Sequence, residues 1–82
     1  MEFKIYSKKN CTACDQAKAL LEAKGIGYEV VDVMTTPTAQ ALFREKGWRS
    51  VPQILLDGEY VGGFEQLKEK FLGGKDEYLA AY

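Results

Sequence analysis

Two cysteines lie where a strand pattern gives way to a helix pattern, and this junction constrains the fold more than any other feature of the chain. Residues 2–6 alternate polar and apolar side chains, which is typical of a strand with one buried face. From Thr12 onward, apolar residues recur at intervals of three and four, which predicts a helix that ends at the left-handed cap position of Gly25. Cys11 and Cys14 therefore lie at a connection from a strand into a helix.

The chain continues with a second strand pattern and a second helix pattern. Residues 28–33 are rich in β-branched side chains, which predicts a strand. Because a helix separates the two strands, we expect a crossover that makes them parallel. Residues 36–38, Thr-Pro-Thr, supply capping and helix-start signals before a second helix over 39–46, which we expect to end at Gly47.

A hairpin pattern and a third helix pattern complete the order of elements. Residues 53–56 and 59–61 predict two antiparallel strands, because the intervening Asp-Gly pair is a strong hairpin-turn signal. Residues 64–72 predict a helix with one apolar face, and 73–82 could form a short terminal helix or a tail. The order predicts an α/β fold in a single domain over 1–82, with a four-stranded mixed sheet flanked by three or more helices.

Composition limits the classes of function that the chain can serve. With 46% hydrophobic and 28% charged residues, this chain of 82 residues has the composition of a globular domain rather than a disordered one. The formal net charge is −1 and the charges are interspersed, so we expect no nucleic-acid partner. No apolar run approaches the roughly 20 residues that cross a bilayer, and the first residues lack a signal-peptide pattern. We expect a cytoplasmic monomer with no membrane partner.

The spacing of the cysteines favours redox chemistry over a structural disulfide or a metal site. A disulfide across two residues closes a very small loop and adds little stability. At a helix start, free N–H groups and the positive end of the dipole would stabilise a Cys11 thiolate as the nucleophile, and Cys14 would resolve the mixed disulfide. The chain has no histidine and no third cysteine, so we expect no zinc site within one chain. An iron–sulfur cluster shared between two chains stays an alternative.

Two further segments have both a structural and a functional interpretation. Residues 50–53, Ser-Val-Pro-Gln, could hold an ordinary trans proline before a strand, since only about 5–6% of X–Pro bonds in folded proteins are cis. The glycine pair at 62–63 could be a plain turn. Alternatively, backbone N–H groups at this helix start could bind a carboxylate, and Glu65 would suit the helix dipole without any ligand.

Over nearly its whole length, the chain resembles a glutaredoxin, a member of the thioredoxin superfamily. The resemblance rests on CTAC after the first strand pattern and on SVPQILLDGEYVGGFEQL later in the chain. The second segment is the more specific, because it joins Val-Pro, a hairpin and Gly-Gly at the family's spacing. The resemblance implies a thioredoxin fold with the order β-α-β-α-β-β-α. It also implies a dithiol–disulfide oxidoreductase in which Cys11 and Cys14 are catalytic and glutathione is the reductant.

The resemblance also implies where glutathione would bind. A cis bond before Pro52 would let the backbone of Val51 hydrogen-bond the peptide-like part of glutathione. Lys8 and Gln53 would lie near the glycine carboxylate of glutathione. Disulfide-containing proteins such as ribonucleotide reductase are the protein partners that the resemblance implies.

The turn at Gly63, Phe64 and Glu65 would receive the γ-glutamyl end of glutathione. Two departures from the family pattern are present. Thr12-Ala13 replaces the commonest Pro-Tyr between the cysteines, and Phe64-Glu65 replaces a small residue followed by aspartate after Gly-Gly. The segments GGFEQLKEKF and KGWRSVPQI are similar to small bacterial and phage redoxins, some of which take electrons from thioredoxin reductase. Thioredoxin reductase as the electron source therefore stays an alternative. An iron–sulfur carrier stays a second one, because the small Ala13 and the absence of proline between the cysteines leave room for a cluster.

Overall fold

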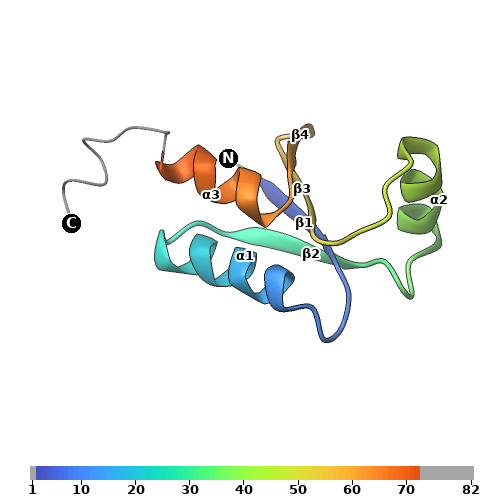
Figure 1. The fold of residues 1–82 in the computed structure, drawn as a ribbon, viewed down its shortest axis with the longest axis horizontal. Helices are drawn as coiled ribbons and strands as arrows, with labels where there is room; N and C mark the ends of the chain where they lie inside the picture. Colours follow the sequence, from blue (N-terminus) through green and yellow to red (C-terminus); the bar gives the residue numbers. More distant parts are fainter. Residues whose placement is uncertain (1, 73–82) are drawn as a thin grey trace.

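The computed structural model describes residues 2–72, and its strands and helices are drawn in Figure 1. The elements are β1 (Phe3–Ser7), α1 (Thr12–Ala23), β2 (Tyr28–Asp32), α2 (Pro37–Lys46), β3 (Gln53–Leu56), β4 (Glu59–Gly62) and α3 (Phe64–Leu72). The predicted terminal helix or tail over 73–82 lies outside the described residues. Within the described residues, the predicted order β-α-β-α-β-β-α is confirmed.

All four of these strands belong to one sheet, in the order β2-β1-β3-β4. β1 runs parallel to β2, because α1 returns the chain to the same end of the sheet. β1 is antiparallel to β3, with Tyr6 opposite Gln53, and β3 and β4 form the predicted antiparallel hairpin. At the turn of this hairpin, Asp57 and Gly58 adopt φ values of 51° and 85°, the left-handed conformation that a tight hairpin turn favours. The α/β class and the mixed sheet are confirmed.

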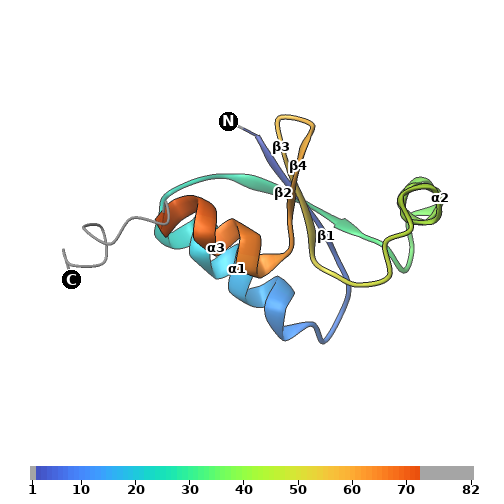
Figure 2. The ribbon, with the colours of Figure 1, turned by 45° about the horizontal axis from the view of Figure 1, so that its top comes forward.

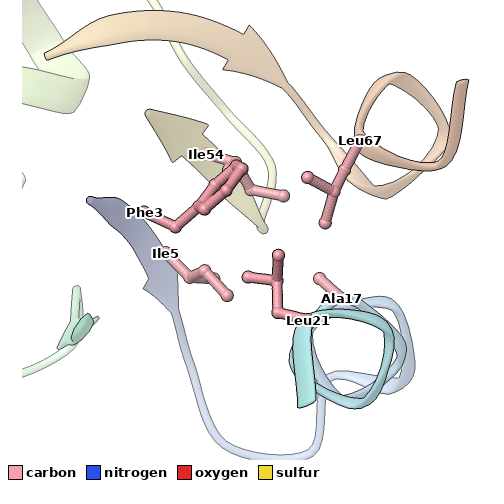
Figure 3. Packing of buried hydrophobic residues seen from close by; sticks show 6 residues of the cluster. All are labelled: Phe3, Ile5, Ala17, Leu21, Ile54 and Leu67. Atoms are coloured by element: carbon pink, nitrogen blue, oxygen red, sulfur yellow. The ribbon is translucent and has the colours of Figure 1, made fainter. Parts of the chain in front are cut away.

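Helices α1 and α3 lie side by side against one face of the sheet, as Figures 1 and 2 show. Because successive side chains of a strand point to opposite faces, alternate residues of β1 and β3 enter the core beneath these helices. Figure 3 shows the buried cluster, which consists of Phe3, Ile5, Ala17, Leu21, Ile54 and Leu67. Tyr6 and Gln53 point to the other face, where α2 lies apart from α1 and α3 (Figure 2).

The first two helices end as the sequence predicts. Gly25 after α1 and Gly47 after α2 adopt left-handed φ values of 71° and 72°. After Gly47, the backbone N–H of Trp48 donates to the carbonyl of Phe43 at 2.9 Å, which is the long hydrogen bond of a Schellman motif. This motif fixes the place where Trp48 leaves α2.

The start of α2 differs from the prediction. The helix begins at Pro37, two residues before the predicted start at Ala39, and Thr36 takes the N-cap position. The fixed φ of proline suits the first turn of a helix, where its missing N–H costs no hydrogen bond. In the described part of the chain, no helix has both the length and the apolar character needed to cross a membrane.

Candidate active site

Cys11 occupies the N-cap position of α1, after the turn that follows β1. Its φ and ψ of −115° and 104° are extended, and its carbonyl accepts a hydrogen bond of the first turn from the N–H of Asp15 at 3.0 Å. The backbone N–H of Cys14 donates to Cys11 Sγ at 3.1 Å. The sulfur thus takes the place of a capping oxygen. A thiolate at this position is stabilised by the same N–H group and by the positive end of the helix.

Cys14 lies one turn into α1 and is disulfide-bonded to Cys11. Cys14 is 0% exposed, whereas Cys11 is 9% exposed. Cys11 is therefore the sulfur that an incoming disulfide can approach. This difference suits the predicted roles, in which Cys11 attacks and Cys14 resolves.

The loop before β3 lies against Cys11. The peptide bond between Val51 and Pro52 is cis, as the resemblance implied. The carbonyl oxygen of Val51 lies 3.8 Å from Cys11 Sγ, and Pro52 is buried. The backbone of Val51 therefore borders the sulfur of Cys11, and its expected hydrogen bond to the peptide-like part of glutathione stays a prediction.

Gln53, which the resemblance placed near a carboxylate of glutathione, is only 6% exposed. Its Nε2 donates to the carbonyl of Ser50 at 3.0 Å. Its Oε1 accepts a hydrogen bond from the hydroxyl of Tyr60 at 2.6 Å. Both ends of the amide therefore have partners within the chain, and only the second N–H of the amide is left to donate to a carboxylate.

Lys8 lies in the exposed turn between β1 and α1. Together with Lys9 and with Met34 of the β2–α2 connection, it lines a hollow in the surface. Within residues 2–72, neither lysine forms an ion pair. The turn that leads to Cys11 therefore carries two positive charges that no carboxylate of the described chain neutralises by direct contact.

The Gly-Gly turn before α3 is bridged by a side chain that the sequence-based reasoning did not single out. The backbone N–H of Gly63 donates to Oε1 of Gln66 at 2.8 Å. The side chain also covers Gly62, because a Cβ on Gly62 would lie 2.7 Å from Gln66 Cγ. Gln66 is the third residue of α3, the position from which glutamine reaches back in a capping box, although Gly63 lacks the Ser or Thr side chain of the full sequence signature. The N–H of Gly63 therefore already has a partner where a carboxylate was expected.

Phe64 and Glu65 begin α3, and each side chain contacts another side chain of this chain. Phe64 packs against the core cluster, and Lys68 Nζ lies 5.5 Å from the centre of its ring. The same Nζ lies 3.4 Å from Glu65 Oε1. For a carboxylate ligand, the first turn of α3 therefore offers its backbone N–H groups rather than these side chains.

Four aromatic side chains pack together on the face of the sheet opposite α1 and α3, and we call Tyr6, Phe43, Trp48 and Tyr60 the aromatic cluster. The ring of Trp48 stacks on Tyr60 with centroids 5.0 Å apart and meets Phe43 edge-on at 5.2 Å. Tyr6 is 8% exposed and lies 5.8 Å from Phe43 and 6.5 Å from Trp48. Tyr6 and Trp48 therefore join α2 and the loop after it to the sheet.

Metal ligands are few in this site. Among residues 2–72, no group of three or more histidine, cysteine, aspartate or glutamate side chains could hold a metal ion. Cys11 and Cys14 would supply two of the four thiolates of an iron–sulfur cluster. A shared cluster therefore requires ligands from outside this chain.

Comparison with known proteins agrees with this geometry. The sequence model of the Glutaredoxin family matches residues 3–61. Glutaredoxin 3 of Escherichia coli (strain K12) is 33% identical over 64 residues, which cover 77% of this chain and 77% of that protein. A buckwheat glutaredoxin–glutathione complex superposes with a TM-score of 0.75 and 27% identity, covering 89% of this chain and 70% of that chain. The glutaredoxin-like NrdH-redoxin from Escherichia coli, which has a thioredoxin-like activity profile, superposes with a TM-score of 0.75 and 26% identity. The superposition covers 88% of this chain and 95% of that chain.

The matched region includes the features on which the site is built. Residues 3–61 contain the Cys11–Cys14 pair at the start of α1 and the cis bond before Pro52. The solved relatives share the thioredoxin fold found here. The chain therefore belongs to the glutaredoxin family and is a thiol–disulfide oxidoreductase whose redox pair is Cys11 and Cys14.

Proposed function

We propose that the chain reduces protein disulfides and glutathione mixed disulfides in the cytoplasm, with glutathione as the reductant that restores its dithiol. The observation that carries this proposal is the position of Cys11 Sγ, which accepts the N–H of Cys14 and lies 3.8 Å from the carbonyl oxygen of Val51. The similarity to Glutaredoxin 3 and to a glutaredoxin bound to glutathione supports the choice of reductant.

The proposed reaction consists of two thiol–disulfide exchanges. The Cys11 thiolate attacks one sulfur of the target disulfide, and the other target sulfur leaves as a thiolate that takes up a proton. Cys14 then loses its proton and attacks Cys11 Sγ, which breaks the mixed disulfide and releases the second target thiol. The target gains two electrons and the Cys11–Cys14 pair loses them.

Glutathione would reopen the disulfide by the same chemistry. One glutathione thiolate attacks Cys11 Sγ and displaces Cys14, and a second glutathione then releases Cys11 and leaves as glutathione disulfide. The backbone of Val51 would align the peptide part of glutathione. The positive charge of Lys8 and the first-turn N–H groups of Phe64 and Glu65 would attract its two carboxylates.

Thioredoxin reductase is a second candidate for the electron source, and specific contacts favour it. The amide of Gln53 and the N–H of Gly63, both expected at glutathione, already have partners within the chain. The similarity to NrdH-redoxin, with its thioredoxin-like activity profile, supports the same choice. With either reductant, ribonucleotide reductase stays the proposed protein partner that the family resemblance implies.

Consumption of NADPH tests the proposed function. The protein is assayed with a small disulfide substrate, once with glutathione and glutathione reductase and once with thioredoxin reductase alone, with Cys11→Ser as the control in both assays. Turnover only with glutathione supports the proposal, and turnover only with thioredoxin reductase replaces glutathione by the second candidate. No turnover above the Cys11→Ser control in either assay would contradict the proposed function.

A further inference from the structure

We propose that Gln53 and Tyr60 are positioning residues, which together hold the loop of residues 50–52 against Cys11. The proposal assigns Gln53 a role inside the protein instead of a direct contact to glutathione. It concerns the shared disulfide-reducing step, so it does not depend on which reductant restores the dithiol.

A continuous series of short contacts connects Tyr60 to the reactive sulfur. The Tyr60 hydroxyl donates to Gln53 Oε1 at 2.6 Å, and Gln53 Nε2 donates to the carbonyl of Ser50 at 3.0 Å. The next residue is Val51, whose carbonyl oxygen lies 3.8 Å from Cys11 Sγ. Within this series, Gln53 supplies the side-chain hydrogen bond that ties β3 to the loop residue preceding Val51.

The aromatic cluster fixes the position of the Tyr60 hydroxyl. Tyr60 is 55% exposed, but its ring stacks on Trp48 with an interplanar angle of 20°. Trp48 is held in turn by its edge-on contact with Phe43 and by the hydrogen bond from its backbone N–H to the Phe43 carbonyl. An exposed tyrosine with one face stacked and its hydroxyl bonded to a buried amide has lost most of its side-chain freedom.

The chemistry of the partners requires an amide at position 53. The Ser50 carbonyl can only accept a hydrogen bond, so the group that faces it must be the NH₂ end of Gln53. The Tyr60 hydroxyl then donates to the amide oxygen, and reversal of the amide would lose the bond to Ser50. Because the side chain is 6% exposed, breaking these bonds would leave polar atoms without partners away from water.

A fixed loop affects both the nucleophile and the substrate. In the reduced protein, the Val51 carbonyl is placed to accept a hydrogen bond from the Cys11 thiol, which favours the thiol over the thiolate. The same backbone borders the place where the target chain must align with the sulfur. If the loop is less ordered before binding, that order must be gained on binding, so KM rises while kcat changes little.

Single and double variants test this proposal. Tyr60→Phe keeps the ring on Trp48 and removes only the hydroxyl, so the variant is expected to fold, and Gln53→Leu removes both amide hydrogen bonds. Tyr28→Phe is the matched control, because the Tyr28 hydroxyl donates to Glu22, away from the Cys11 site, and this hydrogen bond raises the pKa of Tyr28. The measurements are KM and kcat for a protein disulfide with each reductant, and the pH midpoint of iodoacetamide alkylation of Cys11.

The proposal predicts that Tyr60→Phe raises KM about 3- to 10-fold, as expected for one net hydrogen bond, with kcat within about twofold. It also predicts a lower pH midpoint of alkylation and a double variant less affected than the product of the two single effects. Tyr28→Phe should match the wild type. Wild-type KM and midpoint in Tyr60→Phe would overturn the proposal. So would an effect of Gln53→Leu confined to the KM for glutathione, because that result would make Gln53 a direct ligand.

Discussion

The carbonyl oxygen of Val51 lies 3.8 Å from the sulfur of Cys11, although the two residues are 40 positions apart in the sequence. The contact joins the loop before β3 to the start of α1, and the sheet creates it because β1 and β3 are antiparallel neighbours. The end of β1 and the start of β3, the two central strands, therefore lie at the same end of the sheet. The nucleophile and the backbone that borders it are placed by the topology of the fold.

Substitution of each cysteine is expected to have a different effect on disulfide-reducing activity. Cys11→Ser should abolish disulfide reduction, because the 0% exposed Cys14 cannot replace it. Cys14→Ser should keep part of the glutathione-dependent activity on mixed disulfides, since a second glutathione can resolve the intermediate. The assay is turnover of a glutathione mixed disulfide with glutathione reductase. Full activity in Cys11→Ser would show that the nucleophile is wrongly assigned.

Removal of the Gln66 side chain should lower the KM for glutathione. In the wild type, the N–H of Gly63 donates a hydrogen bond to Gln66 Oε1 at 2.8 Å. Gln66→Ala removes this acceptor and leaves the N–H of Gly63 available to a carboxylate. We expect the KM for glutathione to fall about fivefold, the effect of roughly one hydrogen bond. Glu69→Ala, at an exposed position of the same helix, is the control. A higher KM in Gln66→Ala would instead make Gln66 itself a ligand.

The core beneath α1 and α3 should be sensitive to truncation. Leu67 is 0% exposed and joins α3 to the buried cluster, so Leu67→Ala should lower the free energy of unfolding by about 2–5 kcal/mol. Met34 is 66% exposed, and Met34→Ala should change it by no more than about 0.5 kcal/mol. Urea titration followed by circular dichroism measures both values. Equal midpoints for the two variants would contradict this description of the core.

Two glycines provide a test of backbone conformation. Gly62 has a φ of 126°, and a Cβ there would lie 2.7 Å from Gln66 Cγ, so Gly62→Ala should cost about 1–3 kcal/mol of stability. At Gly27 a Cβ would meet nothing within 4 Å, and its φ is not in the left-handed range. Gly27→Ala should therefore be neutral or stabilise the protein by up to about 1 kcal/mol. Thermal unfolding of the two variants gives the comparison, and a Gly62→Ala variant as stable as Gly27→Ala would rule out the strain.

The order of elements and the place of Cys11 could be predicted from the sequence, because both depend on local patterns. Apolar periodicity indicated the strands and helices, and Gly25 and Gly47 indicated where two helices end. The pattern predicts the start of α2 two residues late, at Ala39, because a proline can precede a helix as well as begin it, and Pro37 is the first residue of α2. The cis bond before Pro52 came from the family resemblance, since most X–Pro bonds in folded proteins are trans.

The internal partners of the expected binding groups could not be predicted in the same way. The family motif places Gln53 at a ligand, but its burial and its bond to Tyr60 depend on the pairing of β3 with β4 and on the stack with Trp48. These contacts bring together residues from two strands and the loop after α2. For Gln66, by contrast, the sequence holds half of a local signal, because glutamine occupies the third position of α3 but Gly63 replaces the Ser or Thr of a full capping box.

Trapping of the mixed disulfide tests whether Cys11, at the start of α1, is the nucleophile. Cys14→Ser and Cys11→Ser are each incubated with glutathione disulfide, and the adducts are timed and located by mass spectrometry of peptides. We expect rapid glutathionylation of Cys11 in Cys14→Ser and little adduct on the buried Cys14 in Cys11→Ser. Equal rates at the two cysteines, or faster modification of Cys14, would contradict it.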